Sequence, residues 1–157
     1  MNLLIFLLTL SFQSTLVTDS SDWESKADTV LKYAKDQIGT TYKWGTCKPG
    51  ESFDCSGFTR YAYSKIGVEC PRSSTGLANV GENVSLENCR KGDLLLFRGT
   101  DPNDSSVGHV GIVVSNVGSK IEFIHCSSSK RHYGVVVTEY FGSGYPNRFI
   151  GVKRLFS

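Results

Sequence analysis

The sequence has almost no excess of one charge, no Cys-x-x-Cys motif, and no internal repeat or low-complexity segment. Its 17 Lys and Arg nearly balance 15 Asp and Glu, for a formal net charge of +2. Because no basic cluster interleaves with aromatic residues either, nothing indicates a nucleic-acid partner. The missing Cys-x-x-Cys argues against a zinc knuckle and a thioredoxin-type site. At 157 residues, the chain has room for one domain and no second one.

The N-terminus also lacks Lys and Arg, and no charged side chain occurs before Asp19. The apolar run over residues 3–10 is too short to cross a membrane, but it has the length of the hydrophobic region of a signal peptide. We therefore predict a signal peptide over residues 1–18 and a secreted mature domain over residues 19–157. An uncleaved anchor and a buried helix are the alternatives.

The number of cysteines is odd: they are Cys47, Cys55, Cys70, Cys89 and Cys126. Because cysteines tend to oxidise outside the cytosol, the simplest prediction is two disulfides and one free thiol. The sequence does not choose among the possible pairings. A bridge between Cys70 and Cys89 would close the poorly patterned segment between them, and Cys47 is a candidate to fix its own loop.

Helical patterns come first along the chain, and short strand patterns follow. The first predicted helix starts at the capping box over residues 21–24 and ends at Gly39. The second begins near Asp54 or Cys55 and ends at Gly67. Five β-type runs then cover residues 94–97, 109–115, 121–126, 135–140 and 149–155. This order predicts an α+β fold in which N-terminal helices pack on an antiparallel sheet of about five to six strands.

Cys55 is a candidate nucleophile because it lies at the predicted start of a helix, where unpaired backbone N–H groups favour the thiolate. His109 begins one predicted strand and His125 ends the next, so neighbouring antiparallel strands would bring them to one sheet face. His109 would then take the thiol proton, and His125 would fix its tautomer. The alternatives are a structural cysteine and two ordinary histidines. His132, in a loop-like stretch, is expected to be exposed.

Six motifs occur in order between residues 41 and 140. They are YKWG at 42–45, FDCSGF at 53–58, PRSS at 71–74, KGDLLLF at 91–97, GHVGI at 108–112 and FIH at 123–125. Together they resemble the NlpC/P60 family of papain-like cysteine peptidases, which cut the stem peptides of bacterial cell walls. The resemblance implies a papain-like core, with Cys55 similar to the family nucleophile, His109 to the general base and His125 to the orienting residue.

The same resemblance implies four substrate-binding residues. Tyr42 resembles a tyrosine that lines the site. Asp54 and Ser56 resemble residues that, in some members, receive the free amine of an L-Ala-γ-D-Glu stem. Arg72 is a candidate to bind a substrate carboxylate. Each has a structural alternative: a core residue for Tyr42, helix caps for Asp54 and Ser56, and an ion pair for Arg72.

Together with the predicted signal peptide, the resemblance implies a secreted cysteine endopeptidase that cleaves the amide between D-γ-glutamyl and a diamino acid in peptidoglycan or muropeptides. The Cys55 thiolate would attack and form an acyl-enzyme, which makes Cys55 the free thiol. No metal, organic cofactor or stable membrane association after signal cleavage is implied, and the oligomeric state stays open. The alternatives are a wall amidase or acyltransferase on the same fold, an inactive peptidoglycan-binding module, and a small disulfide-bonded structural protein.

Overall fold

A computed structural model describes residues 20–157. The predicted signal peptide lies outside the described residues. Within them, no helix combines the length and the apolar character that a membrane span requires.

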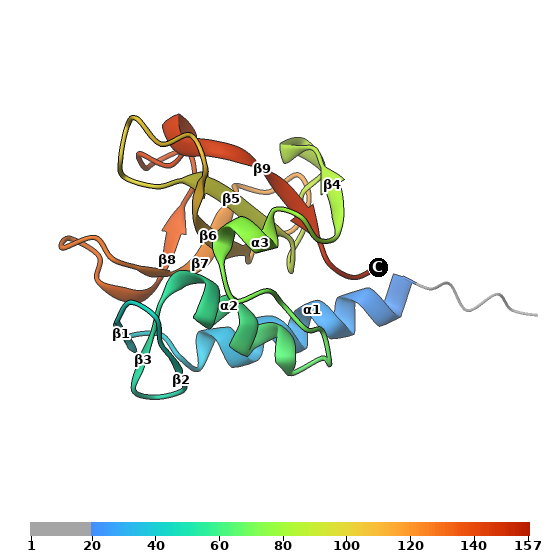
Figure 1. Cartoon of the computed structure of the whole chain (residues 1–157). Helices are drawn as coiled ribbons and strands as arrows, with labels where there is room; N and C mark the ends of the chain where they lie inside the picture. Colours follow the sequence, from blue (N-terminus) through green and yellow to red (C-terminus); the bar gives the residue numbers. More distant parts are fainter. Residues whose placement is uncertain (1–19) are drawn as a thin grey trace, which may run out of the picture.

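Three helices lie in the N-terminal half: α1 over Ser20–Lys35, α2 over Cys55–Ser64 and the short α3 over Ser74–Leu77. Figure 1 shows α1 and α2 lying against each other below the main sheet. Helix α1 buries an apolar stripe that includes Ala27, Val30 and Ala34, as its sequence period predicts. The predicted end of this helix at Gly39 is wrong, because α1 ends at Lys35 and the turn that follows leaves Ile38 exposed.

The main sheet has six strands in the order β4-β9-β5-β6-β7-β8, and all neighbours are antiparallel. The strands are β4 Glu82–Val84, β5 Leu94–Arg98, β6 Val107–Val113, β7 Glu122–Ser127, β8 Gly134–Glu139 and β9 Phe149–Arg154. Short 3-10 helices cover Leu86–Asn88 and Pro146–Arg148. The α+β class and the five predicted strands are confirmed. The sixth strand, β4, comes from a segment without a clear period.

Both faces of this sheet are buried, as strand β5 shows most clearly. Leu94 and Leu96 belong to the cluster that includes residues of α1 and α2, whereas Leu95 and Phe97 belong to a second cluster with Phe123. Successive side chains of a strand point to opposite faces, so one continuous apolar run serves both clusters.

A small sheet leads the chain into α2. It consists of β1 Thr41–Tyr42, β2 Cys47–Lys48 and β3 Ser52–Phe53, in the order β1-β3-β2. Strand β3 ends one residue before Asp54, the N-cap of α2. The small sheet therefore fixes the point at which the helix, and with it Cys55, begins.

All five cysteines lie in the described range, and all are free thiols. The prediction of two disulfides is therefore wrong for this structure. Cys70 and Cys89 are buried in different clusters, the first with α2 and the second with Phe97 and Phe123, so they do not meet. The thiol of Cys47 instead donates a hydrogen bond to the Gly57 carbonyl at 3.2 Å.

Candidate active site

Cys55 is the first residue of α2, and its side chain is held there by the capping of the helix. The carboxylate of Asp54 accepts a hydrogen bond from the Gly57 N–H at 2.7 Å, as an N-cap does. Cys55 is 8% exposed, so the thiol is largely shielded from solvent. The predicted helix start near Asp54 or Cys55 is confirmed.

The helix start is expected to lower the pKa of the Cys55 thiol, but burial outweighs this effect. Burial and the charge of Asp54 raise the pKa of Cys55 to about 11, although the backbone N–H groups of Ser56 and Val110 act in the opposite direction. Burial disfavours a charge more strongly than these few donors favour it. At neutral pH the residue is therefore a thiol and not the expected thiolate.

His109 on β6 and His125 on β7 are in direct contact through their rings. His109 Nε2 lies 2.8 Å from His125 Nδ1, and His125 Nε2 lies 2.9 Å from Thr138 Oγ1 on β8. If His109 carries its proton on Nε2, it donates to His125, which in turn donates to Thr138. This tautomer leaves Nδ1 of His109 free to accept a proton.

Both imidazoles are buried, with His109 at 8% and His125 at 1% exposure. Burial, assisted by the positive charge of Arg148, lowers the pKa of His109 to about 3. Burial also lowers the pKa of His125, together with the charges of His109 and Arg148. At neutral pH both rings are thus uncharged, which is the state that a general base requires.

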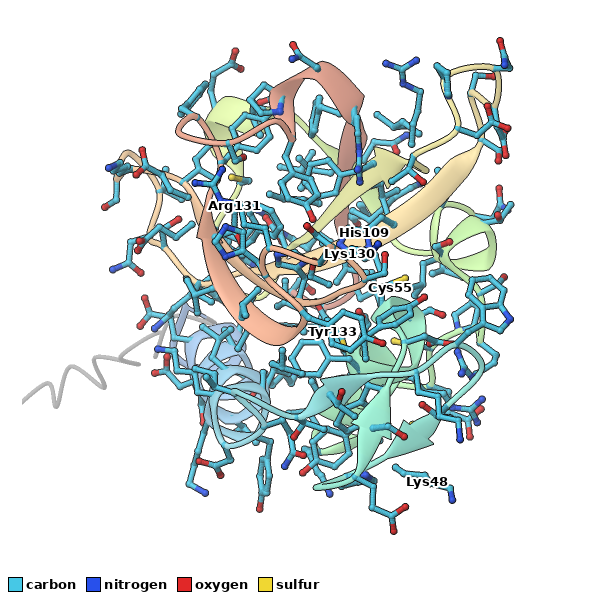
Figure 2. The ribbon with its side chains drawn as sticks, turned by 90° about the vertical axis from the view of Figure 1, so that its left-hand side faces the viewer. Lys48, Cys55, His109, Lys130, Arg131 and Tyr133 are labelled. Carbon is cyan, nitrogen blue, oxygen red and sulfur yellow. The ribbon has the colours of Figure 1, made fainter. Side chains whose placement is uncertain are left out.

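Cys55 and His109 come together because the start of α2 packs against β6. The backbone of Val110, one residue after His109, acts to lower the pKa of Cys55, which places it close to the sulfur. Figure 2 shows the two side chains next to each other, near the turn that carries Lys130 and Tyr133. The structure therefore brings together all three residues that the sequence nominated for catalysis.

Tyr42 forms a wall of the same site. Its ring meets the exposed Tyr133 ring edge-on, with centroids 5.9 Å apart, and the Tyr133 hydroxyl donates to the Tyr42 carbonyl at 2.8 Å. Burial, with the nearby Cys55 and Asp54, raises the pKa of Tyr42 to about 12. The phenol stays protonated and can donate a hydrogen bond.

Asp54, Ser56 and Arg72 form a polar network around Cys55 at the start of α2. The guanidinium of Arg72 makes a bidentate ion pair with Asp54, with both N–O distances at 2.8 Å. The Gly45 N–H also donates to Asp54, and the Ser56 hydroxyl donates to the Arg72 carbonyl at 2.7 Å. The arrangement found is the ion pair, which was the structural alternative for Arg72.

Three residues of the site escaped the sequence analysis: Thr138, Tyr145 and Arg148. Tyr145 places its hydroxyl 3.4 Å from His125 Nδ1, and its ring lies 5.7 Å from the His109 ring. The alternation of side-chain direction along β8 could have identified Thr138 as a candidate, because β8 follows the strand of His125 and pairs with it. Residues 141–148 carried no pattern, so no signal pointed to the other two.

The profile of the NlpC/P60 family matches residues 39–154. The chain belongs to the NlpC/P60 family. The match includes all six motifs and extends the resemblance to the last strand. The recognition made from the sequence is therefore confirmed.

Relatives and solved structures agree with this assignment. The Gamma-DL-glutamyl hydrolase of Bacillus subtilis is 29% identical over 133 residues, 84% of this chain and 30% of that protein. The Probable endopeptidase p60 of Listeria monocytogenes is 31% identical over 126 residues, 80% of this chain and 23% of that protein. The crystal structure of an NlpC/P60 family protein from Bacillus cereus is 30% identical, with a TM-score of 0.71, over 83% of this chain and 40% of that one. The chain thus spans less than half the length of each.

Proposed function

We propose that this protein is a secreted cysteine endopeptidase that hydrolyses the amide between D-γ-glutamyl and a diamino acid in peptidoglycan stem peptides. The observation that carries the proposal is the placement of Cys55 at the start of α2 beside the hydrogen-bonded series of His109, His125 and Thr138. The names of the relatives, a gamma-DL-glutamyl hydrolase and an endopeptidase, support the substrate class and the reaction.

The reaction would start from two neutral groups, the Cys55 thiol and the His109 imidazole. As the Cys55 sulfur attacks the amide carbonyl, its proton passes to Nδ1 of His109, and a tetrahedral intermediate forms. The Cys55 N–H and the Tyr42 phenol are the donors proposed for its oxyanion. His109 then gives the proton to the leaving amine, and the acyl-enzyme remains. Water, deprotonated by His109, releases the acid and restores the thiol.

His125 acts as a positioning residue in this scheme. Its Nδ1 accepts from His109, and its Nε2 is held by Thr138 at 2.9 Å, so the His109 ring cannot rotate freely. In this scheme the orientation leaves Nδ1 of His109 available to Cys55 throughout both half-reactions. Direct substrate contacts by Asp54 and Ser56 stay a prediction. The capping alternative holds for Asp54, which caps α2, but not for Ser56, whose hydroxyl donates to the Arg72 carbonyl.

The test is digestion of purified muropeptides by the wild type and by Cys55→Ala, followed by mass spectrometry. We expect the wild type to release an L-Ala-D-γ-Glu product and the Cys55→Ala variant to release none. Cys47→Ser is the matched control, because Cys47 is exposed and lies outside the site. It should retain wild-type activity.

The product masses separate the alternatives. Release of the whole stem from the sugar would indicate an amidase instead, and joined peptides would indicate an acyltransferase. Equal cleavage by wild type and Cys55→Ala would rule out the mechanism. Tight muropeptide binding by the wild type without any product would identify a binding module and overturn the proposal.

A further inference from the structure

A pocket of about 660 Å³ has His125 in its wall. It lies between the turn that follows β7, the strand β8 and the segment before β9. Residues that line it include His125, Arg131, His132, Thr138, Tyr145 and Arg148. Because Tyr145 lines the pocket and its ring lies 5.7 Å from the His109 ring, the pocket is within one side chain of His109.

Two guanidinium groups in this pocket have no partner among residues 20–157. The guanidinium of Arg131 makes no hydrogen bond or ion pair within this range. That of Arg148 stacks on the Tyr145 ring at 4.9 Å from its centroid, and its Nε is buried without a hydrogen-bond partner. The Arg148 Nε is a buried donor of a kind that is rare in folded proteins and needs an explanation, whereas Arg131 is exposed.

Elsewhere in the described chain, buried carboxylates pair with arginines. Arg72 binds Asp54 at 2.8 Å, and Arg154 binds Asp93 at 2.7 Å. The pocket has one carboxylate among its described lining residues, Glu139, which is paired with Lys120 at 2.5 Å. Arg131 and Arg148 therefore give the pocket positive charge that is unpaired among the described residues, and the pocket is suited to bind an anion.

We propose that this pocket binds a free carboxylate of the stem peptide next to the scissile amide, with Arg131 and Arg148 as its ligands. The inference rests on the proposed function. Guanidinium groups bind carboxylates through two parallel hydrogen bonds, which gives direction as well as charge. The substrate offers two such groups: the α-carboxylate of D-glutamate, free because the chain continues through the γ position, and a carboxylate of the diamino acid.

Occupation of the pocket would also affect the general base. The positive charge of Arg148 contributes to the low pKa of both His109 and His125. A carboxylate bound to Arg148 offsets that charge, so the proton affinity of His109 rises when the substrate is in place. Recognition of the carboxylate thus favours transfer of the thiol proton to His109.

The experiment compares three synthetic stem tripeptides: the natural acid, the α-carboxamide of D-glutamate, and the carboxamide of the diamino acid. Each is tested with wild type, Arg131→Gln and Arg148→Gln. The matched control is Lys48→Gln, which removes a cation that Figure 2 shows away from His109 and that pairs with Glu51 at 3.6 Å.

We expect the wild type to cleave one of the two carboxamides with a kcat/KM at least tenfold below that of the acid. Arg131→Gln and Arg148→Gln should lose at least tenfold on the acid but little on that carboxamide, whereas Lys48→Gln keeps the wild-type ratio. The carboxamide that is discriminated identifies which carboxylate occupies the pocket. If Arg148→Gln does not fold, Arg131→Gln alone decides the test, because Arg131 is exposed and its substitution is not expected to disturb folding.

Equal cleavage of all three peptides by the wild type would overturn the pocket assignment, and so would a preference that survives both arginine substitutions. If the wild type cleaves none of them, the proposed peptidase function fails. The pocket is then judged by calorimetric titration of the acid tripeptide into Cys55→Ala. A Kd unchanged by adding Arg131→Gln overturns the assignment, and a Kd raised tenfold or more supports it.

Discussion

The two regions that flank the proposed catalytic pair, Cys55 and His109, differ in how their polar groups are satisfied. The helix flank consists of Asp54, Ser56 and Arg72, and its charges pair with one another around the start of α2. The sheet flank consists of the histidines, Thr138 and the arginine-lined pocket. There the histidines are neutral, and two guanidinium groups have no partner among the described residues. Saturated groups hold the nucleophile in place, and unsatisfied groups are available to a substrate.

This difference predicts that the sheet flank carries activity rather than stability. Replacing His109 with Gln removes the group that accepts the thiol proton, and general-base catalysis is worth about 10²–10⁴-fold in rate. We expect kcat to fall by that factor while the circular dichroism spectrum stays native. Retention of more than a tenth of the wild-type kcat would show that another group is the base.

The helix flank should respond in the opposite way. Arg72→Gln leaves the carboxylate of Asp54, whose side chain is 8% exposed, without its counter-charge. We expect the free energy of unfolding to fall by about 3 kcal/mol, because a buried charge that loses its partner is costly. Urea denaturation measures this loss. Arg60→Gln, an exposed arginine on α2, is the control and should cost less than about 0.5 kcal/mol.

The double variant Asp54→Asn/Arg72→Gln sharpens the same test. Once both charges are gone, no unpaired ion remains in the interior, so the double variant should lose less stability than the sum of the two single variants. Coupling between contacting residues is typically about 0.5–3 kcal/mol. If the stability losses of the two single variants add up to that of the double variant, the ion pair itself contributes nothing to stability.

The neutral histidines predict a loss of stability in acid. Burial lowers the pKa of His109 from 6.5 to about 3, so between these values the unfolded chain binds the extra proton. Stability therefore falls as the pH decreases below 6.5, by about 1.4 kcal/mol per pH unit for each such histidine. Urea denaturation at pH 7 and pH 5 should show a smaller loss in His109→Gln than in wild type. Equal losses in the two proteins would show that His109 does not contribute to the loss of stability in acid.

The smallest effect is expected at Thr138. Thr138→Val keeps the shape of the side chain but removes the hydroxyl at His125 Nε2, a loss of about 1 kcal/mol in hydrogen bonding. Because the role proposed for His125 is positioning, kcat should fall about five- to tenfold while KM stays constant. Thr29→Val, which removes an exposed hydroxyl on α1, should change neither parameter. A change in KM alone would place Thr138 in substrate binding instead.

Much of the fold could be predicted from the sequence because its signals are local. Asp54 before an apolar stripe marked the start of α2, and alternating or continuous apolar runs marked five strands of the main sheet. The sixth strand, β4, has three residues and an exposed edge pattern, so its pairing with β9 decides its structure. Ile38 continued the helical period of α1, yet it lies in the turn that follows the helix.

The sequence by itself determined the family, the α+β class, and the three residues nominated for catalysis, because these depend on residue types at fixed spacings. Only the tertiary structure decided what surrounds those residues. It kept all five cysteines as free thiols, left the Cys55 pKa raised rather than lowered, and paired Arg72 with Asp54. Burial and pairing depend on which distant segments meet. For the same reason the pocket of Arg131 and Arg148, built from two separate turns beside β8, became visible only in three dimensions.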